Sequence, residues 1–443
     1  MHSQTGNVER TSVDGWDNLL KEIHNSPVHQ LPNEILTEIC TMCWENACSN
    51  PDGNNFSEPR LHIAFILSQV CSRWRSVSCS TPLLWSHVTI LFPERKNSAS
   101  MVRTFVNTCL ERSQNKPLHI TFDSPTTGDA HIPVLLDAVK HSRRWKTAVL
   151  RLGPDDLPNL PNSFPMLEGL VSEGQYFQCN RAWSRIPRRI FLPCIRTLTI
   201  IPPDSGLDTH LDLSTLTTLS ICSTFHAVFD LVQRCPMLEE ADLRIVECEP
   251  FNVINLKVVA AYLRSLTAHH YCLRGILRFL TASSLEEFRT HVESAAIPVC
   301  VPFPAEEFIR FIRRSQCNIT ILEISNYTIL DSEFTKILAT LPMLSHLLFH
   351  QARSPVGIGS LSDHFFHEMT LSSHPFLLPQ LSHLELGIMH RVNEDLIVEM
   401  VRSRVTYSCF RSFVLAHRES VRRETFGVLS MLHGLEFSSK EQS

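Results

Sequence analysis

Three cysteines near the amino terminus, Cys40, Cys43 and Cys48, have a spacing that could bind a metal ion. A zinc site of this kind needs a second pair of ligands, and Cys71 and Cys79 do not provide a Cys-x-x-Cys pair. Cys40 and Cys43 also lie on the apolar face of an expected helix, where cysteine packs as a small hydrophobic residue. The sequence therefore predicts no metal ion and no other cofactor.

A serine and a histidine in the stretch GIGSLSDHFFH, Ser360 and His364, could in principle assist hydrolysis. A hydrolase nucleophile of this kind needs a Gly-x-Ser-x-Gly turn between a strand and a helix, and the stretch lacks that motif. The chain also has no glycine-rich phosphate-binding motif. We therefore expect a protein that is not an enzyme, and we interpret this stretch as a surface insertion.

Arginines lie beside two cysteines in CSRWRSVSC, residues 71–79, where a reactive thiol or a nucleic-acid contact is conceivable. A reactive thiol needs a nearby histidine and an open, electropositive setting. The helical spacing of Cys71 and Trp74 instead places both on one apolar face. Two further basic clusters, SRRWK and RIPRR, belong to a chain of net charge −5, so we expect solvated surfaces and no nucleic-acid partner.

Composition limits the class of protein. Hydrophobic residues make up 43% of the 443 residues and charged residues 19%, so the chain can bury a large core. The 15 cysteines have no framework spacing, and neither a signal-like apolar segment nor an apolar run of membrane-spanning length occurs. We expect reduced cysteines in a cytoplasmic and/or nuclear protein without a membrane partner.

Two expected helices carry the amino-terminal cysteines. The first begins at Leu31-Pro32, because proline favours the first helical turn, and continues through NEILTEICTMCW. The second spans LHIAFILSQVCSRWRSVSCS and ends before Pro82, since the residue preceding a proline avoids helical backbone. A loop rich in Asn, Pro and Gly, about residues 44–60, joins them, and LLWSHVTI then leads into a strand. The second helix has one apolar face, formed by Leu67, Val70, Cys71, Trp74 and either Val77 or Ser78.

Beyond residue 140 the sequence repeats a core of the form L-x-x-L-x-[LI], with WKTAVLRL near Trp145 as a degenerate further copy. Helical patterns such as FHAVFDLVQR, AEEFIRFIRR, SEFTKILATL and NEDLIVEMVRS separate several cores. A strand followed by a helix at this period is typical of leucine-rich repeats, whose units stack because one unit cannot bury its own apolar face. The ten cores begin at Leu167, Ile195, Leu216, Leu238, Leu263, Leu285, Ile319, Leu344, Leu381 and Phe410.

The amino-terminal motifs resemble the F-box, and in particular the F-box-like domains of mushroom-forming fungi. The resemblance rests on SPVHQLPNEIL (26–36), VCSRWRSV (70–77) and TPLLW (81–85), which occur in the family's order, although the joining segment is longer than in the compact F-box. Together with the repeats, it predicts an α/β protein in which a small helical module precedes an irregular solenoid of short parallel strands alternating with helices. The expected organisation is a flexible segment 1–25, an F-box-like domain 26–90, a connecting segment 91–140, a leucine-rich-repeat-like solenoid 141–425 and a tail 426–443.

The resemblance implies a substrate-receptor subunit of a Skp–cullin–F-box ubiquitin ligase. In that family the F-box binds the Skp adaptor and, through it, a cullin, while the carboxyl-terminal domain binds a target protein. Such a receptor acts by holding its target near a ubiquitin-charged enzyme, with no chemistry on its own chain. The alternative is a protein-interaction scaffold that uses the repeats for assembly and joins no ligase. The residues that the resemblance assigns to the module core and adaptor face are Leu31, Pro32, Ile35, Leu36, Ile39, Val70, Cys71, Trp74 and Val77.

Target recognition is expected at the strand positions that alternate with the buried leucines. Successive side chains of a strand point to opposite faces, so the polar residues between the leucines face solvent. Each of them singly has the properties of an ordinary solvent-facing strand residue. The candidates are Thr197, Thr199, Thr218, Glu240, Glu287, Glu323, His346, His383 and Glu385.

Overall fold

The computed structural model describes the chain in segments, and every element below lies within them. Two compact units divide the chain: one comprises Met1–Thr121 and Asp129–Arg144, the other Phe122–Gly128 and Trp145–Ser443. The segment 1–25, expected to be flexible, lies outside the described residues. The structure describes residues 31–49, 63–92, 99–123, 129–152, 156, 159–173, 190–201, 211–245, 257–293, 301–352, 361–370, 377–388, 392–417, 423–432 and 434–441.

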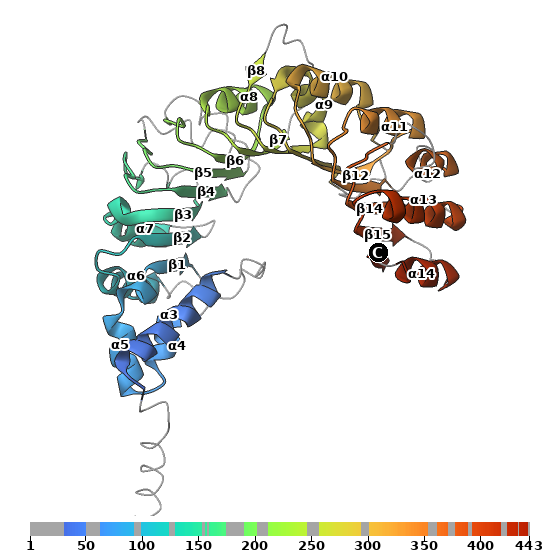
Figure 1. Ribbon diagram of the computed structural model, residues 1–443. Helices are drawn as coiled ribbons and strands as arrows, with labels where there is room; N and C mark the ends of the chain where they lie inside the picture. Colours follow the sequence, from blue (N-terminus) through green and yellow to red (C-terminus); the bar gives the residue numbers. More distant parts are fainter. Residues whose placement is uncertain are drawn as a thin grey trace, which may run out of the picture. The chain divides into compact units, whose positions relative to one another are not determined.

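Parallel strands alternating with helices make up most of the structure, which confirms the predicted α/β class (Figure 1). Fourteen strands, β1 to β7, β9 and β11 to β16, follow one another in a single sheet in the order of the chain. The short strands β8 (Val258–Val259) and β10 (Leu280–Thr281) form a second sheet of two strands. No helix within the described segments is long and apolar enough to cross a membrane.

The described part of the first unit begins with three helices, α3 (Asn33–Ser49), α4 (Ile63–Ser68) and α5 (Ser72–Ser80). The 3-10 helix η1 (Pro82–Trp85) follows, and strand β1 (His87–Leu91) confirms the strand into which LLWSHVTI was expected to lead. The segment 91–140, expected only to connect two domains, contains two helices and a strand. The remaining elements are α6 (Ala99–Arg112), β2 (Leu118–Asp123), η2 (Asp129–His131), α7 (Ile132–Val139) and η3 (Ser142–Arg144).

The prediction of one continuous second helix was wrong, because the chain leaves helical geometry between α4 and α5. The amide of Val70 bonds to the carbonyl three residues back (3.3 Å), and Cys71 has extended backbone (φ −160°, ψ 174°). This break resets the helical phase, so Val70 is exposed although Leu67 and Val77 are buried. The first helix also continues through Ser49, where the sequence predicted a loop from residue 44.

Ten strands of the second unit begin two residues after the ten predicted cores, so the expected parallel strands are confirmed. The degenerate copy is also a strand, β3 (Trp145–Arg151), and β16 (Glu436–Glu441) lies within the segment expected to be a tail. The ten are β4 (Gly169–Glu173), β5 (Thr197–Ile201), β6 (Thr218–Ser223), β7 (Glu240–Ile245), β9 (Ser265–His269), β11 (Glu287–His291), β12 (Ile321–Tyr327), β13 (His346–Gln351), β14 (His383–Ile388) and β15 (Ser412–His417).

A tight turn leads into most of these strands and explains the prolines before the cores. The amide of Leu238 bonds to the carbonyl of Cys235 (3.2 Å), and the same three-residue bond recurs before β4, β5, β6, β9, β13 and β14. Proline suits the second position of such a turn because its φ is fixed near −65°. That position is occupied by Pro165, Pro193, Pro236, Pro342 and Pro379.

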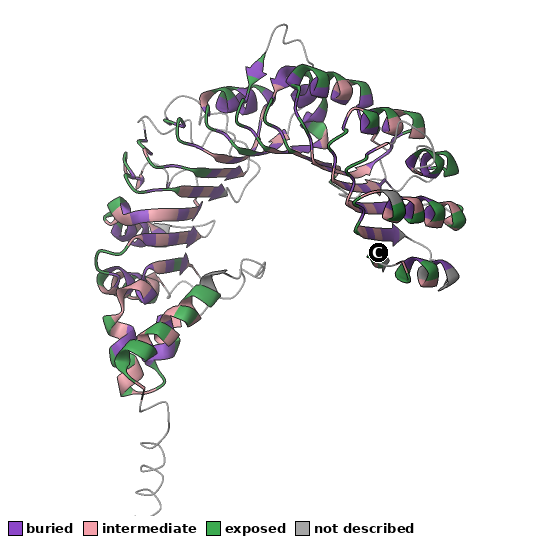
Figure 2. Cartoon of the chain, viewed as in Figure 1, coloured by how far each residue is buried: buried purple, intermediate pink, exposed green. Residues whose placement is uncertain are grey.

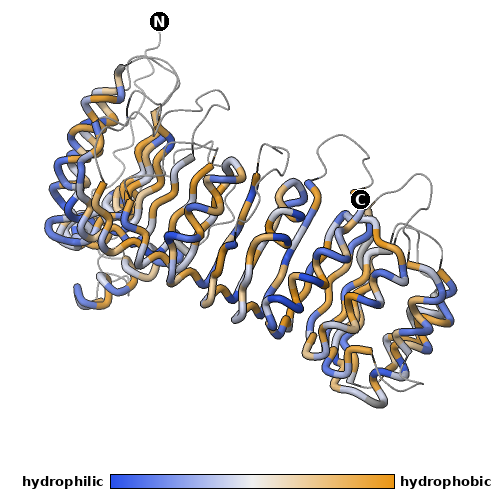
Figure 3. Tube along the Cα trace, turned by 90° about the horizontal axis from the view of Figure 1, so that it is seen from above, coloured by the Kyte–Doolittle hydropathy of each residue, from blue (hydrophilic) through white to orange (hydrophobic). Residues whose placement is uncertain are grey.

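Helices of the second unit cover one side of its sheet (Figure 1). Strand residues alternate between buried positions facing these helices and half-exposed positions on the opposite side, which we call the open face (Figure 2). Hydropathy alternates along the strands in the same way (Figure 3). This repeated arrangement is compatible with a solenoid. The helices are α8 (Phe225–Arg234), α9 (His270–Phe279), α10 (Ala305–Ser315), α11 (Asp331–Ala339), α12 (Asp363–Met369), α13 (Glu394–Tyr407) and α14 (Arg423–Ser430).

Candidate functional site

The helical part of the first unit, α3 to α5, is the first candidate site because it exposes large apolar side chains. Ile35 and Met42 lie two turns apart on α3 and are 41% and 57% exposed. Ile66 on α4 and Val70 after it are 43% and 59% exposed. Single exposed apolar side chains are common on proteins, but several within one small group of packed helices are typical of a protein-interaction surface.

Side-chain hydrogen bonds fix the packing of these helices. Arg73 on α5 donates from Nε to Asn33 Oδ1 (3.0 Å) and from Nη2 to the carbonyl of Leu31, which ties α5 to the start of α3. The buried Trp85 donates from its indole nitrogen to the carbonyl of Ser78 (2.8 Å). The stretch CSRWRSVSCSTPLLW therefore builds a packed module, and Arg73 contacts a neighbouring helix.

The nine residues assigned by the F-box resemblance separate into three groups. Leu36 and Val77 are buried, so they belong to the core of the module. Pro32, Ile35 and Val70 are exposed. The remaining four are half-buried: Leu31, Ile39, Cys71 and Trp74.

All nine predicted target-binding residues lie on the open face, at exposed or half-buried positions. Parallel register aligns Thr197, Thr218, Glu240 and Glu287 in one row across neighbouring strands, with Ser265 between the last two. The same row continues to His346 and His383. The next row, two residues further along each strand, contains Thr199, Glu323 and Glu385.

Two of the predicted glutamates are paired with an arginine between them. Arg289 Nη1 lies 2.8 Å from Glu287 Oε2, and Arg289 Nε lies 3.7 Å from Glu323 Oε2. A third glutamate, Glu385, lies 3.1 Å from His350 Nε2. These side chains stay about one fifth to one third exposed, so the open face presents paired charges of both signs to solvent.

His346 and His383 stack face to face in register, with ring centroids 4.1 Å apart and an interplanar angle of 7°. Each Nδ1 lies 2.8 Å from the hydroxyl of the preceding serine, Ser345 or Ser382. Burial lowers the pKa of His346, and the charge of a protonated His383 lowers it further. We therefore expect His346 to be neutral at neutral pH.

A denser polar cluster lies on the open face around Asp242 of β7. Its carboxylate accepts hydrogen bonds from Ser220 Oγ (3.2 Å) and Arg244 Nη2 (3.4 Å), and Oδ1 lies 3.1 Å from His269 Nε2. Burial raises the pKa of Asp242, but the hydrogen bond with His269 and the charge of Arg244 outweigh burial, so the pKa lies below its usual range. Asp242 is therefore an anion at neutral pH.

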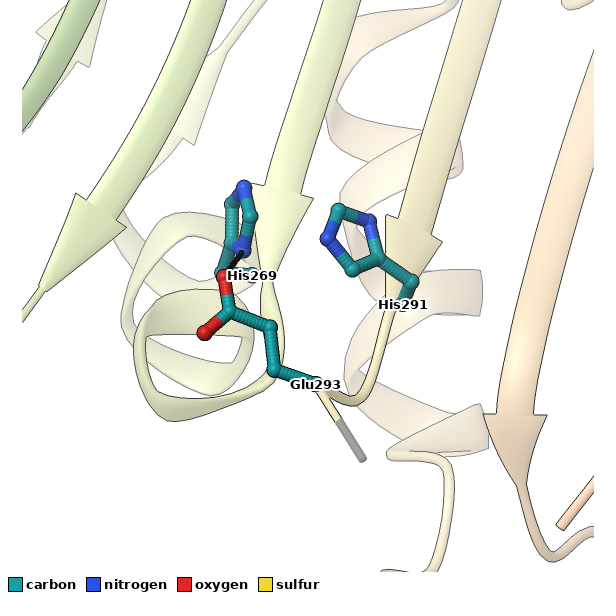
Figure 4. Close-up of side chains that lie close together, drawn as sticks. All are labelled: His269, His291 and Glu293. Carbon is teal, nitrogen blue, oxygen red and sulfur yellow. Dashed lines mark ion pairs between the residues drawn. The ribbon is translucent and has the colours of Figure 1, made fainter. Parts of the chain in front are cut away.

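Two further side chains complete this cluster, His291 and Glu293 (Figure 4). Glu293 Oε1 lies 3.1 Å from His269 Nδ1 and 3.5 Å from Arg244 Nη1. The rings of His269 and His291 are 4.1 Å apart between centroids, at an angle of 70°. Burial lowers the pKa of His291, as does the nearby His269.

Several of the described thiols are buried packing residues. Burial raises the pKa of Cys109, Cys235 and Cys272 to about 12, and it also raises the pKa of Cys40, where Cys43 adds to the effect. A thiol with a raised pKa is a poor nucleophile because little thiolate is present at neutral pH. None of the cysteines in the described segments forms a disulfide. The side chain of Cys48 lies outside the described residues.

Only His364 of the serine–histidine pair considered from the sequence lies in the described segments. His364 is exposed on α12, and its amide donates to Ser362 Oγ (3.2 Å), which caps the helix. Ser360 lies outside the described residues.

Sequence reasoning missed several residues that the structure makes prominent. Met42 belongs to the first expected helix, but nothing in the sequence pattern shows that this position is exposed. Asp242, His269 and His291 could have been found by aligning the ten cores, because they stand four, six and six residues after their core starts, on the open face. Glu293 follows the end of β11, where strand alternation no longer applies.

The sequence matches no known family model and no curated protein.

Proposed function

We propose that this chain is a non-catalytic substrate receptor of a Skp–cullin–F-box ubiquitin ligase. In this proposal the α3–α5 module binds a Skp-type adaptor, and the open face of an irregular leucine-rich-repeat solenoid binds a target protein. The observation that carries the proposal is the set of exposed apolar side chains on the module, Ile35, Met42, Ile66 and Val70.

The core beneath these side chains supports their role in binding. Leu36, Cys40, Leu67 and Val77 already fill the interior of the module, so the exposed residues are not needed to complete it. Moving apolar surface from water into an interface contributes roughly 25 cal/mol per Å². An adaptor that covers these side chains therefore gains binding energy from surface that the folded module leaves in water.

The open face supports a role in target binding. It combines carboxylates, arginine, histidines and hydroxyl groups in rows that run across neighbouring strands. Neighbouring strands are about 4.8 Å apart, so one bound protein can contact several repeats at once. Binding through many such positions needs no reactive group on this chain, and proximity to the charged enzyme then raises the rate of transfer.

Titration calorimetry of the full-length chain with a purified Skp-type adaptor tests the proposal. Ile35→Asp and Val70→Asp place a carboxylate where apolar contact is expected. Only the exposed part of each side chain, 41% for Ile35 and 59% for Val70, remains to be buried, which contributes about 1 kcal/mol. Desolvation of the new carboxylate adds at least about 1 kcal/mol, so each variant should bind at least about tenfold more weakly. Met101→Asp is the matched control, because Met101 is 74% exposed on α6 of the same unit.

Far-ultraviolet circular dichroism must show that all three variants fold like the wild type. Unchanged affinity in both Ile35→Asp and Val70→Asp would contradict an adaptor face on α3–α5. A well-folded wild-type chain that binds no adaptor would contradict the receptor hypothesis as a whole and favour the protein-interaction scaffold.

A further inference from the structure

The cluster at the ends of β9 and β11 brings three potential metal ligands together. His269 and His291 are the last residues of these neighbouring parallel strands and stand directly opposite each other in register. Glu293 follows two residues later and turns its carboxylate back toward His269, while a ring nitrogen of His291 faces the same space (Figure 4). One donor atom from each residue lies within 4.8 Å of the other two.

The hydrogen bond to Asp242 defines which nitrogen of His269 is free. A carboxylate only accepts hydrogen bonds, so the 3.1 Å contact with Asp242 Oδ1 places a proton on His269 Nε2. In a neutral imidazole the other nitrogen, Nδ1, then carries a lone pair. The side chain of His269 is only 5% exposed, and Nδ1 is buried without a hydrogen-bond partner.

The free nitrogen faces an atom that repels it. Glu293 Oε1 lies 3.1 Å from His269 Nδ1, and both atoms are acceptors when the imidazole is neutral. Two lone pairs at this distance repel each other unless a cation lies between or beside them. Arg244 Nη1, 3.5 Å from Glu293 Oε1, offsets part of this repulsion, and a second proton on His269 or a metal ion would remove it. The convergence of His291 on the same space adds a third donor, which a proton on His269 does not use.

We propose that His269, His291 and Glu293 bind a divalent transition-metal ion, with zinc as the best match to the donor set. Two imidazole nitrogens and one carboxylate oxygen are ligands that zinc prefers. Asp242 acts as the outer partner that orients His269, because a metal-bound histidine usually donates its other N–H to a carboxylate or carbonyl. Ser220 Oγ in turn donates to Asp242 (3.2 Å).

Charge and geometry are compatible with a bound cation. Asp242 and Glu293 contribute two negative charges and Arg244 one positive charge, so with neutral histidines this group carries a net charge of −1. Zinc ligands at about 2.0–2.1 Å in a tetrahedral arrangement lie roughly 3.4 Å apart. His269 Nδ1 and Glu293 Oε1, 3.1 Å apart, must therefore separate slightly, whereas any donor pair near the 4.8 Å limit must approach. Glu293, which is 55% exposed beyond the end of β11, can provide much of this adjustment.

Three protein ligands leave one position of a tetrahedral zinc ion free. The cluster belongs to the open face, on which the proposed target binds. A histidine, cysteine or acidic side chain of the target could occupy the free position. This last step rests on the proposed function, whereas the metal site itself does not.

The test is a zinc titration of the full-length chain after chelator treatment, with no adaptor or target present. Calorimetry should detect one tight site, and elemental analysis should find one zinc ion per chain. Cobalt substitution should produce the visible absorption of tetrahedral coordination. Glu293→Gln and His291→Gln should each weaken zinc binding at least tenfold, and Asp242→Asn about tenfold, the lower limit for loss of an outer partner.

His383→Gln is the matched control. His383 and His346 are also in-register histidines 4.1 Å apart on the open face, but they contact serine hydroxyls in place of carboxylates. Zinc affinity should be unchanged in this variant. The proposal is overturned if the wild type binds no zinc, which indicates a second proton on His269, or if His383→Gln weakens binding as much as Glu293→Gln. Because adaptor binding is measured separately, failure of this test leaves the proposed receptor function standing.

Discussion

Two adjacent residues of α3, Ile35 and Leu36, should respond to the same truncation to very different extents. Leu36 is fully buried, whereas Ile35 is 41% exposed. Replacing either residue with alanine removes three carbon atoms from the side chain. The comparison therefore holds chemistry nearly constant and varies only the surroundings.

The structure gives the expected magnitudes. Leu36→Ala leaves a cavity in the closed interior of the module and should lower the free energy of unfolding by about 2–5 kcal/mol. For Ile35→Ala, three methylene equivalents at about 0.8 kcal/mol each set the upper limit, and the exposed fraction reduces it to about 1.4 kcal/mol. Alanine also favours helix by a few tenths of a kcal/mol, so the net loss should be about 1 kcal/mol.

Hydrogen exchange followed by mass spectrometry on peptides from residues 31–49 measures this difference locally. A local measurement is needed because the chain contains two compact units and need not unfold in one step. Exchange of α3 should accelerate about 30-fold or more in Leu36→Ala and about fivefold in Ile35→Ala. Adaptor affinity should fall in Ile35→Ala while α3 stays protected. Equal acceleration in the two variants, or a larger effect at Ile35, would refute the assignment of the buried and exposed sides of α3.

Two further predictions concern buried charges. Hydrogen bonds from Arg103 and, to a lesser extent, from Lys140 lower the pKa of Asp137 to about 2. The ionised carboxylate therefore contributes fully to the free energy of unfolding above about pH 4, and this contribution is lost as the pH falls through 2. Both cations are more than half exposed and therefore screened, so Asp137→Asn should cost about 1 kcal/mol at pH 7 and about half of that at pH 3 in urea denaturation. The buried Arg404 donates to the carbonyls of Met369 (2.9 Å), Leu377 (2.9 Å) and Leu378 (3.2 Å). Arg404→Met should destabilise the second unit by at least about 2 kcal/mol in the same assay, because three buried carbonyls lose their hydrogen-bond donor. This loss outweighs the gain from no longer burying a charged side chain. An unchanged free energy of unfolding would contradict the structural role of Arg404.

The strand positions could be predicted because each core has a local sequence pattern that is still recognisable when one apolar position is substituted. A buried residue at the core start, followed by alternation with a period of two, is imposed by the sheet itself. The core that begins at Leu238 has alanine at the second apolar position, yet β7 still starts two residues after Leu238, at Glu240. Proline in the preceding turn fixes the same offset in several repeats.

The break between α4 and α5 could not be predicted in this way. Neither glycine nor proline occurs between Ile63 and Ser80, so the sequence carries no local breaker, and the apolar spacing continues through Val70 and Cys71. Tertiary packing ends α4, with Arg75 Nε donating to the carbonyl of Ser68 (3.0 Å). For the same reason the sequence could not decide which residues of the F-box-like motifs are exposed.

The two histidine pairs of the open face are placed alike on neighbouring strands, but the groups around each pair differ and give the pairs different chemistry. His269 with His291 and His346 with His383 occupy adjacent strands in register, and both pairs have centroids 4.1 Å apart. The chain contains 22 histidines, so the presence of histidine at these positions does not tell the two pairs apart.

The surrounding acceptors separate the pairs chemically. Serine hydroxyls can donate hydrogen bonds to Nδ1 of His346 and of His383, so neither Nδ1 needs a cation as its partner. Around His269 the partners on both nitrogens are carboxylates, which only accept, so the nitrogen that lacks the proton needs a cation. If target binding requires zinc, replacement of Glu293 should abolish it while replacement of His383 weakens it only by the loss of one contact. If the open face acts as a uniform polar surface, the two substitutions should weaken target binding to a similar extent.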